Sequence, residues 1–320
     1  MFVLLATVIS SSLVVAKENE LPRAKLTVRV IDEAGQTVAN AQVRIGFMEK
    51  TSTELPAMAV GLTDKAGEFT AEGNSTIVLD ADVRKEGYYL GGPPRVMFKA
   101  LTNDMWYPWN PTVQATIRKI ENPIPMYAKN IDSKIPETAK PCGYDLQAGD
   151  WVMPYGKGKT ADFIFSWTNS PDPKFEWDGT AILAFSDPLD GLQEADLHQY
   201  TNTVFRWPRQ APDIGYQNSF TARYAWPKYG NGKSVMTFDP GGLSQAYFFR
   251  VRTVEQEGKI VSGLYGKIKG GIEIYPQADQ TCVLRFRYYL NPTPLDRNMK
   301  FDLKRNLFTN LPFLEEPRTP

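Results

Sequence analysis

Short runs of alternating hydrophobic and polar residues cover most of the sequence after residue 25. In the first run, Leu26, Val28 and Val30 alternate with Thr27 and Arg29. A period of two places successive side chains on opposite faces of a β-strand. Comparable runs follow about every ten residues, and turn-forming sequences such as Asp-Lys-Ala-Gly separate them. This pattern predicts a β-sandwich or barrel.

The second half of the sequence repeats this pattern, and it contains no sustained hydrophobic repeat at helical spacing. The best short candidate for a helix is DGLQEADLHQY, residues 190–200. We therefore predict an all-β protein. The strands predicted for the second half are TADFIFSW, GTAILAFS, NTVFRW, SFTARYAW, SVMTFD, AYFFRVRTV, GLYGKIKGGIEIY and TCVLRFRYYL.

The chain is about twice the usual length of one domain, which predicts two domains. Residues 111–120 alternate like the last strand of a sandwich, and the following IENPIPMYAK is extended and interrupted by proline. We therefore place the first domain at 22–121 and a second, β-rich domain at 122–320.

Three stretches of the first domain carry a recognisable pattern: LTVRVIDEAGQTVANAQVRI, GLTDKAGEFT and KEGYY. Through them, the domain resembles the carboxypeptidase regulatory-like domain, a small transthyretin-like Greek-key β-sandwich. Asp32 to Gly35 matches the first hairpin turn of that family, Val38 to Val43 a strand entry, and Thr63 to Phe69 the second hairpin. Thr37 stands where the family usually has proline. The resemblance implies an accessory module without catalytic residues.

The second domain is similar to the second domains of exported bacterial proteins that carry the same kind of first domain and have no assigned function. This resemblance implies no particular activity. We expect a larger β-sandwich or jelly-roll-like domain at 122–320.

The first sixteen residues predict a signal peptide. Residues 2–16 are apolar, and the first charge is Lys17. This run is shorter than the roughly 20 apolar residues that span a bilayer, and Val14-Val15-Ala16 forms a small-residue cleavage site. No Lys or Arg precedes the apolar run, which is atypical. No later stretch is long and apolar enough to cross a membrane, so we expect a secreted or periplasmic protein.

The overall charge argues against some partners. The 36 Lys and Arg residues equal the 36 Asp and Glu residues in number, so no global field attracts nucleic acid or anionic lipid. The two cysteines, Cys142 and Cys282, could form a disulfide in an oxidising compartment. The sequence leaves equally open that they are separate buried thiols.

The sequence GKGKT at 156–160 resembles a phosphate-binding loop but fails its spacing. A Walker loop that ends at Gly158-Lys159-Thr160 requires glycine at position 153, where Met153 stands. Such a loop also opens a helix, whereas the next residues, ADFIF, favour a strand. We interpret the stretch as a turn before a strand, and we expect no nucleotide and no other cofactor.

Catalytic patterns are sparse. His198 is the only histidine, which excludes a histidine-rich zinc site, and no nucleophile elbow accompanies it. The acidic stretch at 187–196 fails the spacing of a calcium loop. A glycosidase needs only two carboxylates, and Glu176 and Asp239 lie beside aromatic residues. A polysaccharide hydrolase therefore stays an alternative, although we expect no enzymatic activity.

Two groups of side chains are candidates for ligand binding. Trp106 and Trp109 lie in a Pro-rich turn, where they could stack on sugars or close the end of a sandwich. Pairs of cations also lie two residues apart on predicted strands, so that each pair would share a face. If these strands were neighbours, one sheet face would carry six cations: Arg250, Arg252, Lys267, Lys269, Arg285 and Arg287. Such a face could bind acidic glycans, or it could be an ordinary solvated face.

We therefore predict an exported, non-enzymatic protein that binds carbohydrate at the cell envelope. The alternatives are the hydrolase above and a structural module of the envelope. Binding to a glycan array separates the first from the third, and release of reducing sugar identifies the hydrolase.

The predicted cleavage site is directly testable. We expect the exported protein to begin at Lys17, because Ala16 closes the only small-residue site after the apolar run. Mass spectrometry of secreted or periplasmic material measures this terminus. A full-length chain found in the cytoplasm contradicts the prediction of export.

Overall fold

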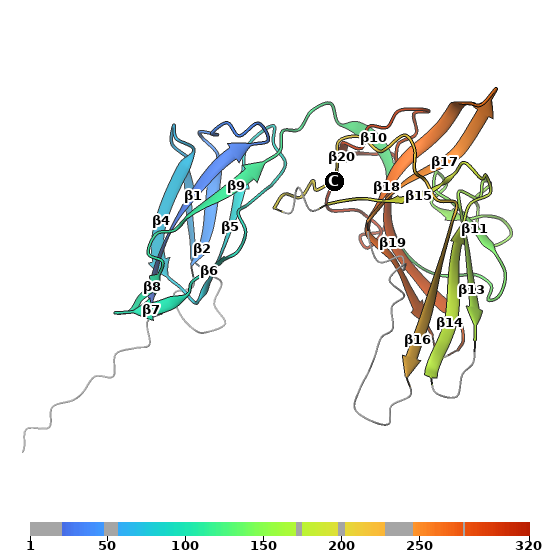
Figure 1. The fold of residues 1–320 in the computed structure, drawn as a ribbon, viewed down its shortest axis with the longest axis horizontal. Coiled ribbons are helices and arrows are strands. Elements are labelled where there is room, and N and C mark those ends of the chain that lie inside the picture. Colours follow the sequence, from blue (N-terminus) through green and yellow to red (C-terminus); the bar gives the residue numbers. More distant parts are fainter. Residues whose placement is uncertain (1–20, 48–56, 171–174, 198–201, 228–245, 278) are drawn as a thin grey trace, which may run out of the picture. The chain divides into compact units, whose positions relative to one another are not determined.

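A computed structural model describes residues 21–47, 57–170, 175–197, 202–227, 246–277 and 279–320. The signal peptide predicted at 1–16 lies outside these residues. The chain divides into unit 1, Met1–Lys119, and unit 2, Ile120–Pro320 (Figure 1). All regular elements of the described residues are strands, which confirms the predicted all-β class. This part of the chain contains no helix suited to crossing a membrane.

Unit 1 consists of two packed sheets. In the first sheet, β4, β1, β8 and β7 follow in this order, and β9 also pairs with β1, in parallel. The second sheet has the order β3, β2, β5, β6. The strands are β1 (Arg23–Asp32), β2 (Gln42–Phe47), β3 (Ala57–Leu62), β4 (Glu68–Asn74), β5 (Val78–Arg84), β6 (Val96–Met97), β7 (Ala100–Thr102), β8 (Met105–Tyr107) and β9 (Thr112–Ile117).

The core of unit 1 follows from the alternation of its strands. Leu26, Val28 and Val30 of β1 are fully buried and face Val43 and Ile45 of β2, which are also fully buried. Packing between the two sheets removes these hydrophobic side chains from contact with water. This removal is the main favourable term in folding. The period of two in the sequence therefore identified the correct face of β1.

Two turns of unit 1 use the same device. The carboxylate of Asp32 accepts hydrogen bonds from the backbone N–H groups two and four residues later, both at 2.9 Å. Asp64 does the same, again at 2.9 Å. Each turn then needs a residue with positive φ, which Gly35 and Gly67 supply at 77° and 76°. The Asp-x-x-Gly sequences thus form turns at the expected positions. They are not hairpins of paired strands, because β1 and β4 belong to one sheet and β2 and β3 to the other.

Unit 2 is a larger sandwich of two sheets. One sheet has the order β15, β17, β18, β19, β10, β20, and the other has the order β12, β11, β13, β14, β16 (Figure 1). The strands are β10 (Ile124–Lys134), β11 (Cys142–Asp145), β12 (Asp150–Trp151), β13 (Phe163–Asn169), β14 (Phe175–Ala184), β15 (Gly191–Glu194), β16 (Ser219–Pro227), β17 (Tyr247–Gln256), β18 (Lys259–Pro276), β19 (Cys282–Leu290) and β20 (Phe301–Asn306).

Aromatic rings fill the space between the sheets of unit 2. The ring of Phe163 lies 5.2 Å from that of Phe249 and 5.5 Å from that of Phe185, both nearly perpendicular to it. Edge-to-face pairs at these distances are favourable beyond the area that they bury. Phe163 comes from one sheet and Phe249 from the other, so these contacts join the two layers.

Two predictions at the level of strands need correction, and one falls outside the described residues. The helix candidate at 190–200 contains β15, whose four residues pair with β17. The predicted strand NTVFRW, at 202–207, is not a strand, and its Phe205 and Trp207 are fully buried. The stretch IENPIPMYAK, predicted to be extended, runs into the long strand β10 from Ile124 onwards. The predicted strand SVMTFD lies outside the described residues.

The contact of Phe69 with Gly61 gives a test of unit 1. A Cβ atom on Gly61 would lie 2.0 Å from the Phe69 ring, so the ring packs directly on the backbone of β3. Because the ring is half-buried against the core, we expect Phe69→Ala to lower the free energy of unfolding by about 3 kcal/mol. Urea unfolding measures this change. Val60→Ala on the exposed side of β3 is the control and should change it by less than about 0.5 kcal/mol, and equal effects would contradict the assignment.

Candidate functional site

The six predicted cations lie on three adjacent strands of unit 2, because β17, β18 and β19 are neighbours in the sheet. Their side chains nevertheless have very different surroundings. The structure gives each of them hydrogen-bond partners within the chain. The cations differ in whether a carboxylate partner balances their positive charge or whether all their partners are neutral.

Arg250 is buried and bound to backbone carbonyls. Its guanidinium donates to the carbonyl of Leu189 at 3.1 Å from Nε and to that of Asp213 at 3.0 Å from NH1. It also lies 4.9 Å from the centre of the Tyr216 ring. Only 6% of the residue is exposed, so Arg250 fixes two loops rather than presenting a charge to solvent.

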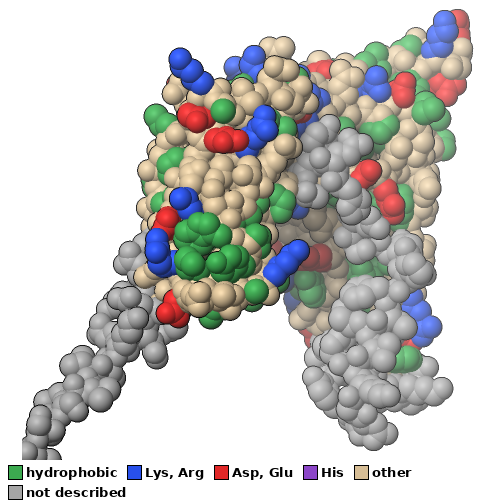
Figure 2. Space-filling model, turned by 60° about the vertical axis from the view of Figure 1, so that its left-hand side comes forward, with side chains coloured by type: hydrophobic (Ala, Val, Ile, Leu, Met, Phe, Trp, Pro, Cys, Tyr) green, Lys and Arg blue, Asp and Glu red, His purple; other side chains and the backbone are tan. Residues whose placement is uncertain are grey.

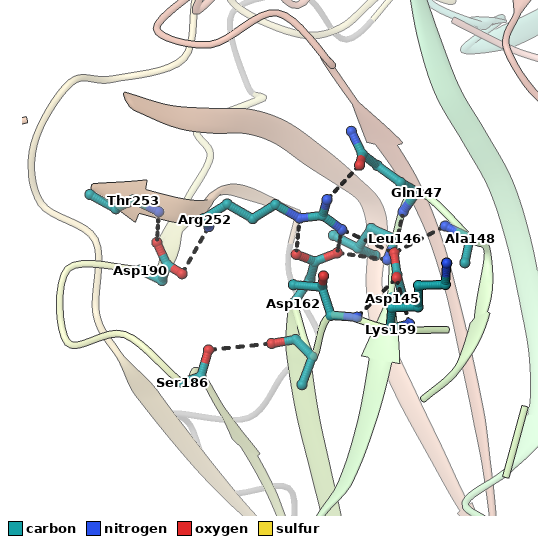
Figure 3. A network of polar contacts seen from close by, with 12 residues as sticks. Asp145, Leu146, Gln147, Ala148, Lys159, Asp162, Ser186, Asp190, Arg252 and Thr253 are labelled. Atoms are coloured by element: carbon teal, nitrogen blue, oxygen red, sulfur yellow. Dashed lines mark hydrogen bonds and ion pairs between the residues drawn. The ribbon is translucent and has the colours of Figure 1, made fainter. Parts of the chain in front are cut away.

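Arg252 does not share a face with Arg250, contrary to the prediction from spacing. The pairing of β17 with β18 shifts register after Val251, and Arg252 has a φ of 56°. This bulge redirects the side chain towards Asp145 and Asp162, which lie at β11 and just before β13 in the other sheet of unit 2 (Figure 3). The strict alternation assumed for this strand therefore ends at Val251.

A third carboxylate holds the bulge in place. Asp190 accepts the backbone N–H groups of Arg252 and Thr253, each at 3.0 Å (Figure 3). A bulge removes such groups from the strand ladder, and a buried N–H without a partner is costly. Asp190 is itself buried, which raises the pKa of its carboxyl group. Its role is therefore structural.

The guanidinium of Arg252 joins two carboxylates. It donates to Asp162 at 2.7 Å and 2.9 Å and to Asp145 at 3.0 Å, and it also contacts Gln147. Asp162 further accepts the backbone N–H of Leu146 at 2.8 Å. The side chain of Asp162 is fully buried, so its negative charge depends on this arginine.

The sequence GKGKT does bind an anion, but the anion belongs to the protein. The backbone N–H groups of Lys159 and Thr160 donate to one oxygen of Asp145 at 2.9 Å and 3.0 Å. Those of Gln147 and Ala148 donate to the other oxygen at 3.0 Å. The loop is therefore a turn before a strand, as predicted, and the Asp145 carboxylate occupies its ring of donors.

These contacts set the protonation of Asp145. Burial acts to raise the pKa of the carboxyl group, but the hydrogen bonds from Lys159, Ala148 and Thr160 and the charge of Arg252 together hold it below its ordinary value. A lowered carboxyl pKa contributes stability that is present above the ordinary pKa and is lost as pH falls through the folded value. The contribution of Asp145 is thus lost in acid, whereas burial raises the pKa of Asp162 and Asp190 in the same network (Figure 3).

Lys267 is enclosed by aromatic rings. Its Nζ lies 4.8 Å from the centre of the Phe205 ring, 4.9 Å from that of Tyr289 and 5.4 Å from that of Trp207, and it donates to the carbonyl of Met299 at 2.8 Å. The residue has no exposed surface. Cation–π contacts stabilise an ammonium group in such a place, so Lys267 is part of a core.

Arg285 is balanced by a carboxylate at the surface. Its Nε donates to Asp132 at 2.9 Å, and its guanidinium lies 4.7 Å from the centre of the Tyr275 ring. Both charged side chains are about half exposed, at 48% and 62%. An exposed pair of this kind contributes little to stability and leaves no net charge.

Lys269 and Arg287 form the remaining group, and only neutral oxygens are bound to them. Thr319 Oγ1 accepts from Lys269 Nζ at 2.7 Å and from Arg287 at 3.4 Å. Lys269 also donates to the carbonyl of Val204 at 3.4 Å, and Arg287 to Asn130 Oδ1 at 2.5 Å. Within the described residues, no carboxylate lies at ion-pair distance from either cation.

The electrostatic effect of this arrangement is seen in the pKa of Lys269. Burial first, and then the charges of Arg287 and Arg206, lower the pKa of its ammonium group to about 8. We call Arg206, Lys269 and Arg287 the cation cluster. Sequence reasoning identified two of its members but missed Arg206 and Thr319, since no periodic pattern connects either of them with these strands.

The two predicted tryptophans lie in unit 1. Trp106 of β8 donates from Nε1 to the carbonyl of Ser75 at 2.8 Å, and its ring stacks on Phe98 with centres 6.0 Å apart. Trp109 is half-buried beneath Arg23, whose guanidinium lies 5.7 Å from the ring centre. These contacts favour the closing of a sandwich end over the stacking of sugars.

The cysteines are separate thiols. Cys142 and Cys282 are both buried and free, and each contacts backbone carbonyls. Burial raises the pKa of both thiols, to about 12 for Cys282. Neither thiol therefore has the lowered pKa of a reactive cysteine.

The residues considered for catalysis give no constellation. His198 and Asp239 lie outside the described residues, and the side chain of Glu176 does too. The buried carboxylates that the structure describes are all bound to arginine or to backbone N–H groups: Asp145, Asp162, Asp178 and Asp190. No group of three potential metal ligands occurs in the described ranges. Positive and negative side chains are interspersed on the face shown in Figure 2.

Comparisons with known proteins give no assignment. No family model and no curated protein matches the chain, so the resemblance of 22–121 to a carboxypeptidase regulatory-like domain stays a prediction. Solved structures with some similarity include 3-chlorocatechol 1,2-dioxygenase from Rhodococcus opacus 1CP, with 12% identity, a TM-score of 0.26, and coverage of 32% of this chain and 63% of that chain.

Two pilins are similarly distant. The streptococcal ancillary pilin has 9% identity and a TM-score of 0.23, over 75% of this chain and 57% of that chain. The major pilin subunit BcpA of Bacillus cereus has 9% identity and a TM-score of 0.21, over 82% and 95%. The chain covers less than two thirds of the length of the dioxygenase and of the ancillary pilin. Scores this low support no inference about function.

The network around Arg252 gives the second structural test. We expect Arg252→Met to lower the free energy of unfolding by about 3–5 kcal/mol, because it leaves the buried carboxylates of Asp145 and Asp162 without their partner. Arg285→Met is the matched control, and its loss should be below about 1 kcal/mol, since Asp132 is exposed to water. Urea unfolding of both variants measures the difference, and similar losses would contradict the account.

Proposed function

We propose that the protein is an exported, non-enzymatic binding protein that recognises acidic carbohydrate through the cation cluster of unit 2. The observation that carries this proposal is that Lys269 and Arg287 share one neutral acceptor, Thr319 Oγ1, and that no ion pair joins either of them to a carboxylate among the described residues. Export rests on the signal peptide predicted at 1–16, and unit 1 is proposed as the accessory module that its family resemblance implies.

The geometry of the cluster suits an anionic oxygen. One oxygen atom, Oγ1 of Thr319, already accepts hydrogen bonds from both Lys269 and Arg287. A carboxylate or sulfate oxygen at this place would make charge-assisted bonds, which are stronger than bonds to a neutral hydroxyl. It would also offset the repulsion from Arg287 and Arg206, which together with burial lowers the pKa of Lys269.

Carbohydrate is the class of ligand that combines such anions with hydroxyl groups outside the cell. The side-chain oxygen of Asn130 accepts a hydrogen bond from Arg287 at 2.5 Å and so holds this guanidinium in place. Uronic acid carboxylates and sulfate esters supply the negative charge. The neutral overall charge of the chain makes such a site local, and its binding should be sensitive to salt.

The alternatives receive less support. A hydrolase requires two carboxylates that face a common cleft, whereas the four buried ones described above already have partners within the chain. A purely structural envelope module requires no ligand, and it leaves the unbalanced charge of the cluster without a purpose. It is therefore the outcome expected if no acidic carbohydrate binds.

Removal of the two strand cations tests the proposal. We expect Lys269→Ala/Arg287→Ala to weaken binding to a sulfated polysaccharide such as heparin by tenfold or more, because two hydrogen bonds to a charged group are lost. Arg285→Ala is the control, since it removes one positive charge from β19, the strand of Arg287, at a site that Asp132 balances. Affinity chromatography at low and high salt measures retention, and equal retention of all three proteins would contradict the proposal.

The pKa of Lys269 predicts a dependence on pH. Lys269 is charged below a pKa of about 8 and neutral above it, so binding should weaken between about pH 7 and pH 9. In Lys269→Arg the charge persists through this range, and the loss should disappear. Titration calorimetry at several pH values measures this. The proposal would be wrong if both proteins bound equally at every pH.

A further inference from the structure

The segment Pro312–Pro320, which we call the strap, lies along unit 2 after the last strand. Its first half is bound to the edge of β10. The N–H of Asn130 donates to the carbonyl of Glu315 at 2.8 Å, and its side-chain amide donates to the carbonyls of Leu314 and Glu316 at 3.0 Å and 3.1 Å. Lys129 forms an ion pair with Glu315 at 2.9 Å. This half is the base of the strap.

The second half, Pro317–Pro320, reaches the cation cluster. Besides the two bonds to its hydroxyl described above, Thr319 accepts a hydrogen bond at its carbonyl oxygen from the Tyr289 hydroxyl at 2.6 Å. Pro317 and Pro320 on either side of it are buried. We call these four residues the tip. The tip covers the same nitrogen atoms that the proposed ligand would use.

The base and the tip differ in the nature of their bonds. The base has a charged pair and three hydrogen bonds that leave no donor of Asn130 unused. The tip supplies one neutral hydroxyl to two cations. Burial and the nearby charge of Arg287 lower the pKa of Lys269 there. An anionic oxygen satisfies these cations better than the hydroxyl does, whereas nothing in such a ligand replaces the bonds of the base.

We propose that the tip of the strap is a built-in competitor for the anion site: it occupies the cation cluster through Thr319, and an acidic carbohydrate displaces it while the base stays bound. This inference rests on the proposed function. A site that is partly closed binds with an affinity reduced by the fraction of time that it is open. The strap therefore lowers the affinity of the site. A single weak anion does not bind strongly enough to displace the tip, whereas a multiply charged polymer does.

Removing the tip tests this idea. In a chain shortened after Glu316, the base is intact and the cluster is open. We expect its affinity for a sulfated oligosaccharide to rise about three- to tenfold, as measured by titration calorimetry. We also expect an amine-reactive reagent to modify Lys269 faster at pH 8 than in the full chain, which mass spectrometry of the labelled peptide measures without any ligand.

Two full-length variants support the comparison. Thr319→Glu places a carboxylate between the cations and should lower the affinity below that of the unchanged protein, whereas Thr319→Val removes the shared acceptor with little change in shape and should raise it. These variants test the proposal even if the shortened chain does not fold, since neither of them removes the base.

The outcomes separate the strap from the function. If Lys269→Ala/Arg287→Ala abolishes binding but neither the shortened chain nor the Thr319 variants change it, the strap proposal is wrong and the binding function stands. If no protein binds the oligosaccharide, yet the shortened chain is labelled faster at Lys269, the tip is a cover and the carbohydrate proposal is wrong. Unchanged labelling and unchanged affinity together overturn the strap.

Discussion

The ion pair network of Arg252 is the interaction on which the arrangement of unit 2 depends. Its guanidinium comes from β17 in one sheet, and its partners Asp145 and Asp162 adjoin β11 and β13 in the other (Figure 3). Buried charges are tolerated only when they are paired and hydrogen-bonded. This requirement explains the bulge after Val251, the hydrogen bonds of Asp190 to the N–H groups of that bulge, and the N–H donors around Asp145.

The same requirement explains the partners of the cations that lie on the neighbouring strands. Arg250 is bound to carbonyls, Lys267 to aromatic rings and a carbonyl, and Arg285 to Asp132. Each of these side chains is explained by the fold alone. At Lys269 and Arg287 the described residues supply only neutral oxygens, and the lowered pKa of Lys269 records the cost. The binding site and the cover that we propose for it would account for that cost.

The sequence was sufficient for the features that depend on near neighbours. The period of two located the buried face of β1, and Asp-x-x-Gly identified the turns at Asp32 and Asp64, because each carboxylate binds N–H groups only two and four residues away. The failure of GKGKT as a phosphate loop was also predictable from spacing. That Asp145 would fill the loop was not.

Features that depend on distant residues could not be predicted. The turn of Arg252 away from Arg250 depends on Asp162, 90 residues earlier in the chain. The strap has no hydrophobic period, and its contact with Lys269 joins positions 50 residues apart. Residues 202–207 alternate like a strand, yet Phe205 and Trp207 are buried around Lys267 outside any sheet. At Arg252 and at 202–207, alternation gave a local preference that a contact distant in sequence overrode.

The central claim is that Lys269 belongs to an anion site whose charge the protein itself does not balance. Nuclear magnetic resonance of carbon-13-labelled lysine side chains, with Lys269→Arg used to assign the signal, measures the pKa of this residue directly. The account predicts a pKa of about 8 that rises when a sulfated oligosaccharide is added. A pKa at the ordinary value of 10.5 that does not respond to the oligosaccharide would contradict it.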